Sequence, residues 1–145
     1  MKSIYEDISE LLNKKIGESL EISKEINVKD LGDNRVKIKS PIFLEINFIL
    51  SNQREVQADF KIEADLGLYC DRCLKEFNKK INSNFRQIYR TKKIRRQEDQ
   101  EDNEEEIMPI LPDQKVEIFE PMRQEILLTL PYKILCNEKC KGIKY

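Results

Sequence analysis

The stretch that decides the fold is VQADFKIEADLGLYC, residues 56–70, in which apolar and polar side chains alternate. Alternation of this length predicts a β-strand with one buried face and one face in water. Residues 42–50 alternate in the same way, and the polar turn at 51–54 joins the two stretches into an expected hairpin. The side chains expected on its buried face are Ile42, Leu44, Ile46, Phe48, Leu50, Val56, Ala58, Phe60, Ile62, Ala64, Leu66 and Leu68.

Weaker patterns surround this hairpin. Alternation predicts one strand over 20–28 and another over 79–90, the latter with Ile81, Phe85 and Tyr89 facing inward. Residues 4–14 predict a short amphipathic helix or a strand followed by a turn. Residues 116–130 predict a helix, because Pro121 suits a first helical turn and Pro131 ends the pattern. The expected fold class is α+β, an antiparallel β meander of four to five strands with a short N-terminal helix and a C-terminal helix.

A charged insert interrupts the C-terminal half. Its basic residues give way to seven acids at 98–106, with almost no apolar side chain to bury. We therefore expect a single domain over 1–145 with an acidic, disordered loop at about 91–110.

Composition excludes several classes of protein. The 145 residues carry 26 Lys and Arg against 27 Asp and Glu, so no global charge attracts nucleic acid. There is no histidine and there are only four glycines, which excludes histidine-based catalytic sites and glycine-rich phosphate loops. We expect no enzymatic activity and no small-molecule substrate. No apolar run is long enough to cross a membrane, and acids near the N-terminus argue against a signal peptide, so we expect a cytoplasmic protein.

Four cysteines form two close pairs, Cys70 with Cys73 and Cys136 with Cys140. Two such pairs on separate segments can supply the four thiolates of a tetrahedral zinc site, so one zinc ion per chain is expected. Two other interpretations stay open: inert thiols, and a redox-active pair at Cys70 and Cys73. The redox interpretation needs a helix after the first pair, which the predicted meander does not offer.

Cations gather on the last predicted strand and just after it. The expected RNA-binding residues are Lys80, Arg86, Arg90, Lys92, Lys93, Arg95 and Arg96. Such a stripe can follow a ribose-phosphate backbone, with Phe85 and Tyr89 interleaved. The simpler interpretation is a solvated strand face with these two aromatic residues in the core.

Several motifs, taken in order, resemble one protein family. They are CDRCL at 70–74 after an apolar strand, an acidic gap, VEIFEPMRQEILLTLP at 116–131, and LCNEKCKG at 135–142. Together they resemble the YceD family, the large ribosomal RNA subunit accumulation proteins. The matching positions are Cys70, Arg72, Cys73, Leu74, Leu130, Pro131, Cys136, Cys140, Lys141 and Gly142. The tail departs from the family pattern, because Lys144 stands where another cysteine is usual and a final cysteine pair is missing.

The resemblance implies a non-enzymatic role in ribosome biogenesis, in which the protein supports accumulation of 23S ribosomal RNA. The expected partner is pre-ribosomal large-subunit RNA or an early large-subunit ribosomal protein. The alternative hypothesis is a thiol-active or zinc-clamped adaptor that makes no direct contact with RNA.

Overall fold

The computed structural model describes residues 3–91, 107–130 and 133–135. A six-stranded sheet has the order β2-β4-β5-β6-β7, with β3 also beside β5. Its strands are β2 (Ser19–Ile26), β3 (Val36–Ile38), β4 (Ile42–Asn52), β5 (Glu55–Tyr69), β6 (Glu76–Thr91) and β7 (Ile107–Ile110). A separate ribbon pairs β1 (Tyr5–Asp7) with β8 (Lys115–Glu117), and the helices are α1 (Ser9–Leu12) and α2 (Phe119–Leu128).

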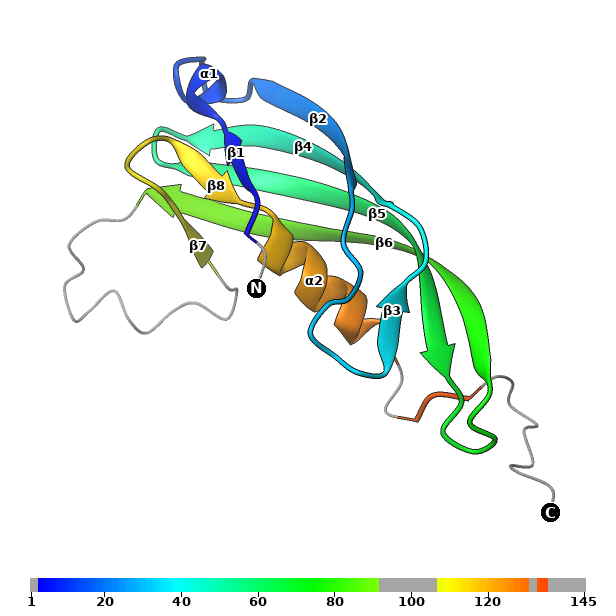
Figure 1. Cartoon of the computed structure of the whole chain (residues 1–145). Helices are drawn as coiled ribbons and strands as arrows, with labels where there is room; N and C mark the ends of the chain where they lie inside the picture. The colour runs from blue at the N-terminus through cyan, green and yellow to red at the C-terminus, as the bar shows by residue number, and fades with distance from the viewer. Residues whose placement is uncertain (1–2, 92–106, 131–132, 136–145) are drawn as a thin grey trace.

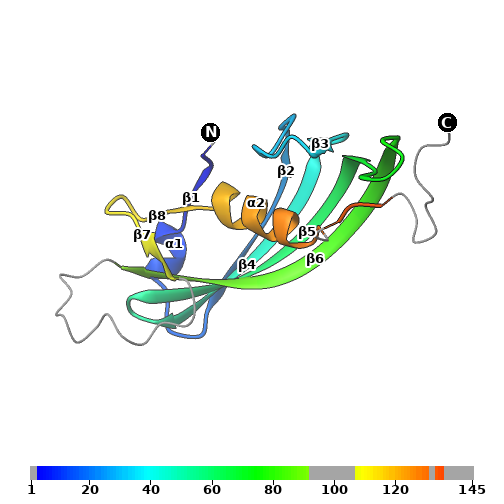
Figure 2. The same ribbon diagram turned by 90° about the horizontal axis from the view of Figure 1, so that it is seen from below.

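The sheet is curved, and α2 and the β1–β8 ribbon lie on its concave side (Figures 1 and 2). The even-numbered side chains of β5, from Val56 to Leu68, all point into this side and are buried. They form one apolar core with Phe119, Met122 and Ile126 of α2. The helix is also tied to the loop after β2, because Arg123 Nε donates to the carbonyl oxygen of Leu31 at 2.6 Å. Neither helix of the described ranges is long and apolar enough to cross a bilayer.

The predicted hairpin is confirmed as β4 and β5, and the last predicted strand is confirmed as β6. The C-terminal helix is confirmed over Phe119–Leu128, with Pro121 in its first turn. At the N-terminus, the strand β1 precedes a helix of only four residues, so each of the two expectations for 4–14 is met in part.

The expected meander is wrong in one respect, because β7 pairs with β6 in the parallel direction, Ile88 beside Ile107. The strands β3, β7 and β8 were not expected. At the two ends of the expected loop at about 91–110, Thr91 is the last residue of β6 and 107–110 form β7. The rest of that segment, 92–106, lies outside the described residues.

Tyr89 joins the sheet to the ribbon above it. Its ring is fully buried near Phe48, and its hydroxyl donates to the carbonyl oxygen of Glu117 on β8 at 2.7 Å. Burial raises the pKa of Tyr89 far above its usual range, so this donor stays protonated.

Replacing Tyr89→Phe should lower the free energy of unfolding by about 1 kcal/mol, because a buried carbonyl loses its donor. Urea unfolding followed by circular dichroism measures the change. The matched control is Tyr5→Phe, which removes the same atom from a side chain that is 49% exposed and should change nothing. Equal effects of the two substitutions would contradict a structural role for the Tyr89 hydroxyl.

Candidate functional site

The first cysteine pair lies in the tight turn between β5 and β6. The backbone N–H of Cys70 donates to the carbonyl of Lys75 at 2.9 Å, and the N–H of Leu74 donates to the carbonyl of Cys70 at 2.9 Å. These two bonds close the turn at the far end of the two longest strands. The turn is therefore a rigid extension of the sheet rather than the start of a helix, which disfavours the redox interpretation.

Leu74 holds the backbone of this turn in an unusual conformation. Its φ is 63°, in the left-handed region that favours glycine, although its side chain is 64% exposed and gains little from burial. A residue in this conformation directly after the second cysteine turns the chain sharply back toward β6. A glycine at position 74 would adopt the same backbone conformation with less steric strain.

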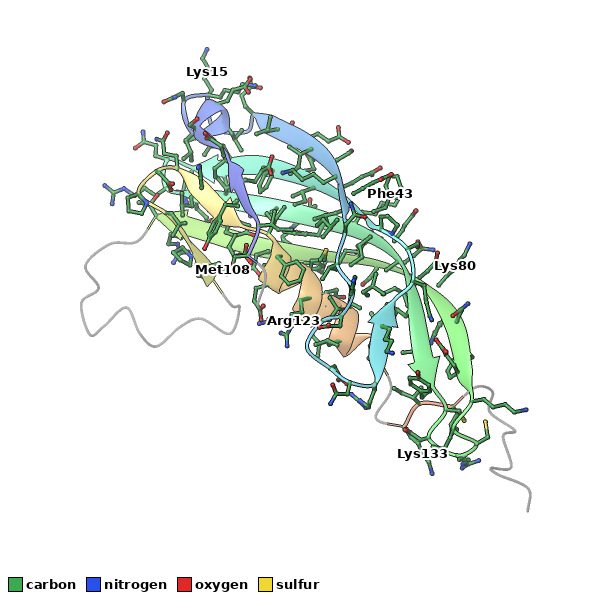
Figure 3. All side chains as sticks on the ribbon, viewed as in Figure 1. Lys15, Phe43, Lys80, Met108, Arg123 and Lys133 are labelled. Atoms are coloured by element: carbon green, nitrogen blue, oxygen red, sulfur yellow. The ribbon has the colours of Figure 1, made fainter. Side chains whose placement is uncertain are left out.

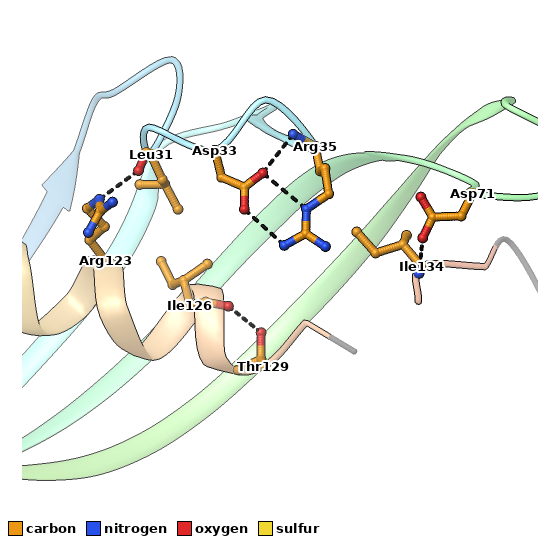
Figure 4. Close-up of polar contacts among 8 residues, drawn as sticks. All are labelled: Leu31, Asp33, Arg35, Asp71, Arg123, Ile126, Thr129 and Ile134. Carbon is orange, nitrogen blue, oxygen red and sulfur yellow. Dashed lines mark hydrogen bonds and ion pairs between the residues drawn. The ribbon is translucent and has the colours of Figure 1, made fainter. Parts of the chain in front are cut away.

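Asp71, between the two cysteines, anchors the C-terminal segment of the described chain (Figure 4). Its backbone N–H donates to the carbonyl of Ile134 at 2.7 Å, and its Oδ2 accepts from the N–H of Ile134 at 2.6 Å. Ile134 itself is buried. Two hydrogen bonds and a buried side chain therefore place the chain leading to the second cysteine pair against the turn that carries the first.

The structure describes only two of the four predicted zinc ligands. Cys70 is buried and Cys73 is partly exposed. Cys136 and Cys140 lie outside the described residues. Within the described ranges no group of three metal-ligating side chains occurs, so the expected zinc site stays a prediction.

Three of the seven predicted RNA-binding residues are described, namely Lys80, Arg86 and Arg90. All three are exposed and alternate along β6 with the buried Ile81 and Tyr89, so they lie on the convex face (Figure 3 labels Lys80). Two of them have carboxylate partners on β5. Arg86 Nε lies 2.9 Å from Asp59, and Arg90 Nη2 lies 2.6 Å from Glu55. The third is Lys80, opposite Asp65 in the strand register. The other four, Lys92, Lys93, Arg95 and Arg96, lie outside the described residues.

The two arginine pairs differ in environment. The Glu55 side chain is only 15% exposed, and hydrogen bonds from Arg90 and then Ser51 hold its pKa below its usual range. The Asp59 side chain is 42% exposed and meets Arg86 in open solvent. An exposed pair such as Arg86–Asp59 contributes about 0–1 kcal/mol, so Arg86 can exchange its carboxylate for a phosphate at small cost. Releasing Arg90 costs more, because it leaves the partly buried Glu55 carboxylate with the hydrogen bond from Ser51 alone.

The aromatic residues between these cations belong to the core. Phe85 stacks on Phe60 with ring centres 4.5 Å apart, and Tyr89 is buried. Their inward orientation is confirmed, and neither ring is presented to a base on the convex face.

Sequence reasoning missed the partners of these residues. It gave no role in a site to Asp59, Glu55 or Asp71. The hairpin register, in which Glu55 faces Arg90 and Asp59 faces Arg86, places opposite charges side by side. Assigning the strand register outward from the cysteine turn would have placed Glu55 opposite Arg90 and Asp59 opposite Arg86. Nothing in the sequence indicated the hydrogen bonds between Asp71 and Ile134.

Comparison with models of known protein families finds one match, over residues 58–144, to the family described as large ribosomal RNA subunit accumulation protein YceD. The matched range takes in the cysteine turn, β6, α2 and the tail. No curated protein and no solved structure matches the chain.

Replacing Leu74→Gly should raise the free energy of unfolding by about 1 kcal/mol, because glycine adopts a left-handed φ without steric strain. Thermal unfolding of the reduced protein measures the gain. The control is Lys75→Gly at the next, exposed position, which should lower stability since no left-handed φ is recorded there. A loss of stability in Leu74→Gly would contradict the strain.

Proposed function

The chain belongs to the YceD family, and from this premise we propose that it is a non-enzymatic, cytoplasmic factor that supports accumulation of 23S ribosomal RNA by binding large-subunit precursor RNA. The family description supplies the link to large-subunit ribosomal RNA. Direct contact with RNA is the further step, and it rests on the cations of β6.

The observation that carries this step is the exposed row of Lys80, Arg86 and Arg90 on one face of β6. At about 3.3 Å per residue, Lys80 and Arg86 are about 20 Å apart along the strand, a length over which a nucleic acid backbone presents several phosphates. The sequence adds four more cations at 92–96, directly after the strand. A row of this kind favours phosphate contacts that do not read sequence.

The β5 carboxylates set the strength of this contact. RNA phosphates must compete with Asp59 and Glu55 for Arg86 and Arg90, so we expect a low affinity for RNA. This affinity should fall steeply as the salt concentration rises.

Removing the two arginines and removing their two partners should have opposite effects. Arg86→Gln with Arg90→Gln should weaken binding to structured large-subunit RNA fragments and reduce the salt dependence by roughly one unit of slope per lost contact. Asp59→Asn with Glu55→Gln should strengthen binding, because both arginines are released. Fluorescence anisotropy at several salt concentrations measures both.

The matched control is Glu21→Gln with Glu25→Gln, two exposed carboxylates on β2 that make the same change in net charge away from the arginines. It should raise affinity much less than the β5 pair. If the arginine variant leaves affinity and salt slope unchanged, RNA does not bind through β6.

A second candidate partner is an early large-subunit ribosomal protein, and the convex face beyond β6 favours it. Exposed Phe43 on β4 lies directly between Glu25 of β2 and Glu63 of β5 in the strand register. Carboxylates around an exposed ring suit a basic polypeptide. Loss of ribosomal RNA in cells carrying Phe43→Ala, with RNA affinity unchanged, would favour this partner.

We also propose that Cys70, Cys73, Cys136 and Cys140 bind one zinc ion. The support is the pair of hydrogen bonds between Asp71 and Ile134. Two residues span at most about 7 Å, so the chain after Ile134 can deliver Cys136 to the cysteine turn. When bound, zinc would add a cross-link between the sheet and the tail, with no catalytic role.

Protein purified under reducing conditions should contain close to one zinc per chain by elemental analysis. Cys70→Ser with Cys73→Ser should abolish binding, because two thiolates do not hold structural zinc. Asp71→Ala should weaken zinc retention against a chelator, whereas Asp71→Asn, which keeps an oxygen acceptor, should weaken it less.

Metal-free protein whose unfolding is unaffected by chelator would contradict the zinc site. A disulfide between Cys70 and Cys73 that forms and is reduced during turnover would then support the thiol-active alternative.

A further inference from the structure

One edge of the main sheet is open in the described structure. The strand β6 is paired with β5 from Glu76 to Arg90. On its other side, β7 covers only Ile88–Thr91. Within the described ranges no strand borders the remaining twelve residues of this edge, 76–87. A long edge of this kind offers a row of backbone donors and acceptors to another strand.

The strand register shows which backbone groups face this edge. At one end of the hairpin, the N–H of Thr91 donates to the carbonyl of Arg54 at 2.8 Å, and at the other end the carbonyl of Lys75 accepts from the N–H of Cys70. The backbone groups of odd-numbered β6 residues therefore bond toward β5. In an antiparallel pair this direction alternates along the strand. The N–H and C=O groups of even-numbered residues from Glu76 to Arg86 therefore point outward.

We propose that two copies of the chain pair antiparallel through this edge, with Ile81 on the two-fold axis. In this register, two residues that lie opposite each other across the interface have numbers that add up to 162. On the convex face, Glu76 meets Arg86 of the partner subunit, Asn78 meets Asn84 of the partner subunit, and Lys80 meets Asn82 of the partner subunit. Each contact occurs twice because the interface is self-complementary.

The concave face matches in the same register. Phe77 meets Phe85 of the partner subunit, and Lys79 meets Ser83 of the partner subunit. Phe85 also lines a hollow of about 260 Å³ beside α2, together with Leu128, which is 79% exposed. A phenylalanine arriving from the partner would cover both apolar side chains, which supplies a hydrophobic reason to pair.

Like charges disfavour three other registers. If Lys80 lay on the axis, it would face Lys80 of the partner subunit and the two positive charges would repel. If Lys79 lay on the axis, the two Lys79 side chains would repel in the same way. With Ser83 on the axis, Lys80 meets Arg86 of the partner subunit. The register centred on Ile81 opposes no like charges and places Glu76 against Arg86 of the partner subunit. A register centred on Asn82 opposes no like charges either, but it places Arg86 against Asn78 of the partner subunit and forms no ion pair. The edge charges therefore favour the register centred on Ile81 over these alternatives.

Pairing would also serve binding to RNA. It places the two exposed β6 rows side by side at the centre of one continuous sheet, so that Lys80 and Arg86 of both copies form a single cationic surface. The two cysteine turns then lie apart, one on each side of the axis.

The oligomeric state of the full-length protein tests this interface. Sedimentation equilibrium should show a monomer–dimer equilibrium. Asn82→Lys, which puts a lysine opposite Lys80 twice, should weaken dimerisation about tenfold, and Asn82→Glu should tighten it by a similar factor. Residue 82 is exposed, so both variants should keep the thermal unfolding of the native protein.

Cysteine cross-linking tests the register. Ile81→Cys should form a disulfide-linked dimer under mild oxidation, because non-hydrogen-bonded partners lie about 4.5 Å apart between Cα atoms. Ser83→Cys, about 13 Å from its counterpart, should not do so beyond the background from the native cysteines. Monomeric native protein at every concentration, or cross-linking at 83 instead of 81, would overturn the proposal.

Discussion

The buried face of β5 is the constraint on which the rest of the structure depends. Its side chains from Val56 to Leu68 cannot leave the core, so the strand cannot slip by one residue without exposing all of them. Because β3, β4 and β6 all pair with β5, this one alternation also fixes which of their residues face water. The helix α2 then covers the concave side, and the proposed sites lie on the convex face, at the open edge and at the cysteine turn.

The hairpin of β5 and β6, formed by the two longest strands of the described structure, carries both candidate sites. One end closes in the cysteine turn, where Asp71 holds Ile134 and brings the tail back to the sheet. Along its length the same pairing sets carboxylates of β5 opposite arginines of β6. This neutralises the stripe in the free protein while leaving it exposed. The proposed binding to RNA is therefore an exchange of ion pairs, and it needs no conformational change in the sheet.

Sequence reasoning was most reliable where a pattern is long and its period is clear. Alternation predicted β4, β5 and β6 and the inward orientation of Tyr89, and proline positions bounded α2. It failed for β3, β7 and β8, which have three or four residues each and pair with strands far away in the chain. The parallel pairing of β7 with β6 could not be predicted either, because it depends on where the chain returns after an insert that has no apolar pattern of its own.

The sequence by itself determined the buried face of the hairpin, the positions of the four cysteines, the cationic row and the family. Each of these is a matter of local period, spacing or motif. Only the tertiary structure decided that Arg86 and Arg90 meet carboxylates, that Leu74 adopts a left-handed backbone, that Asp71 holds the tail, and that one edge of β6 is open in the described structure. These features depend on register and on contacts between residues up to 63 positions apart, and such contacts arise only when the whole core forms.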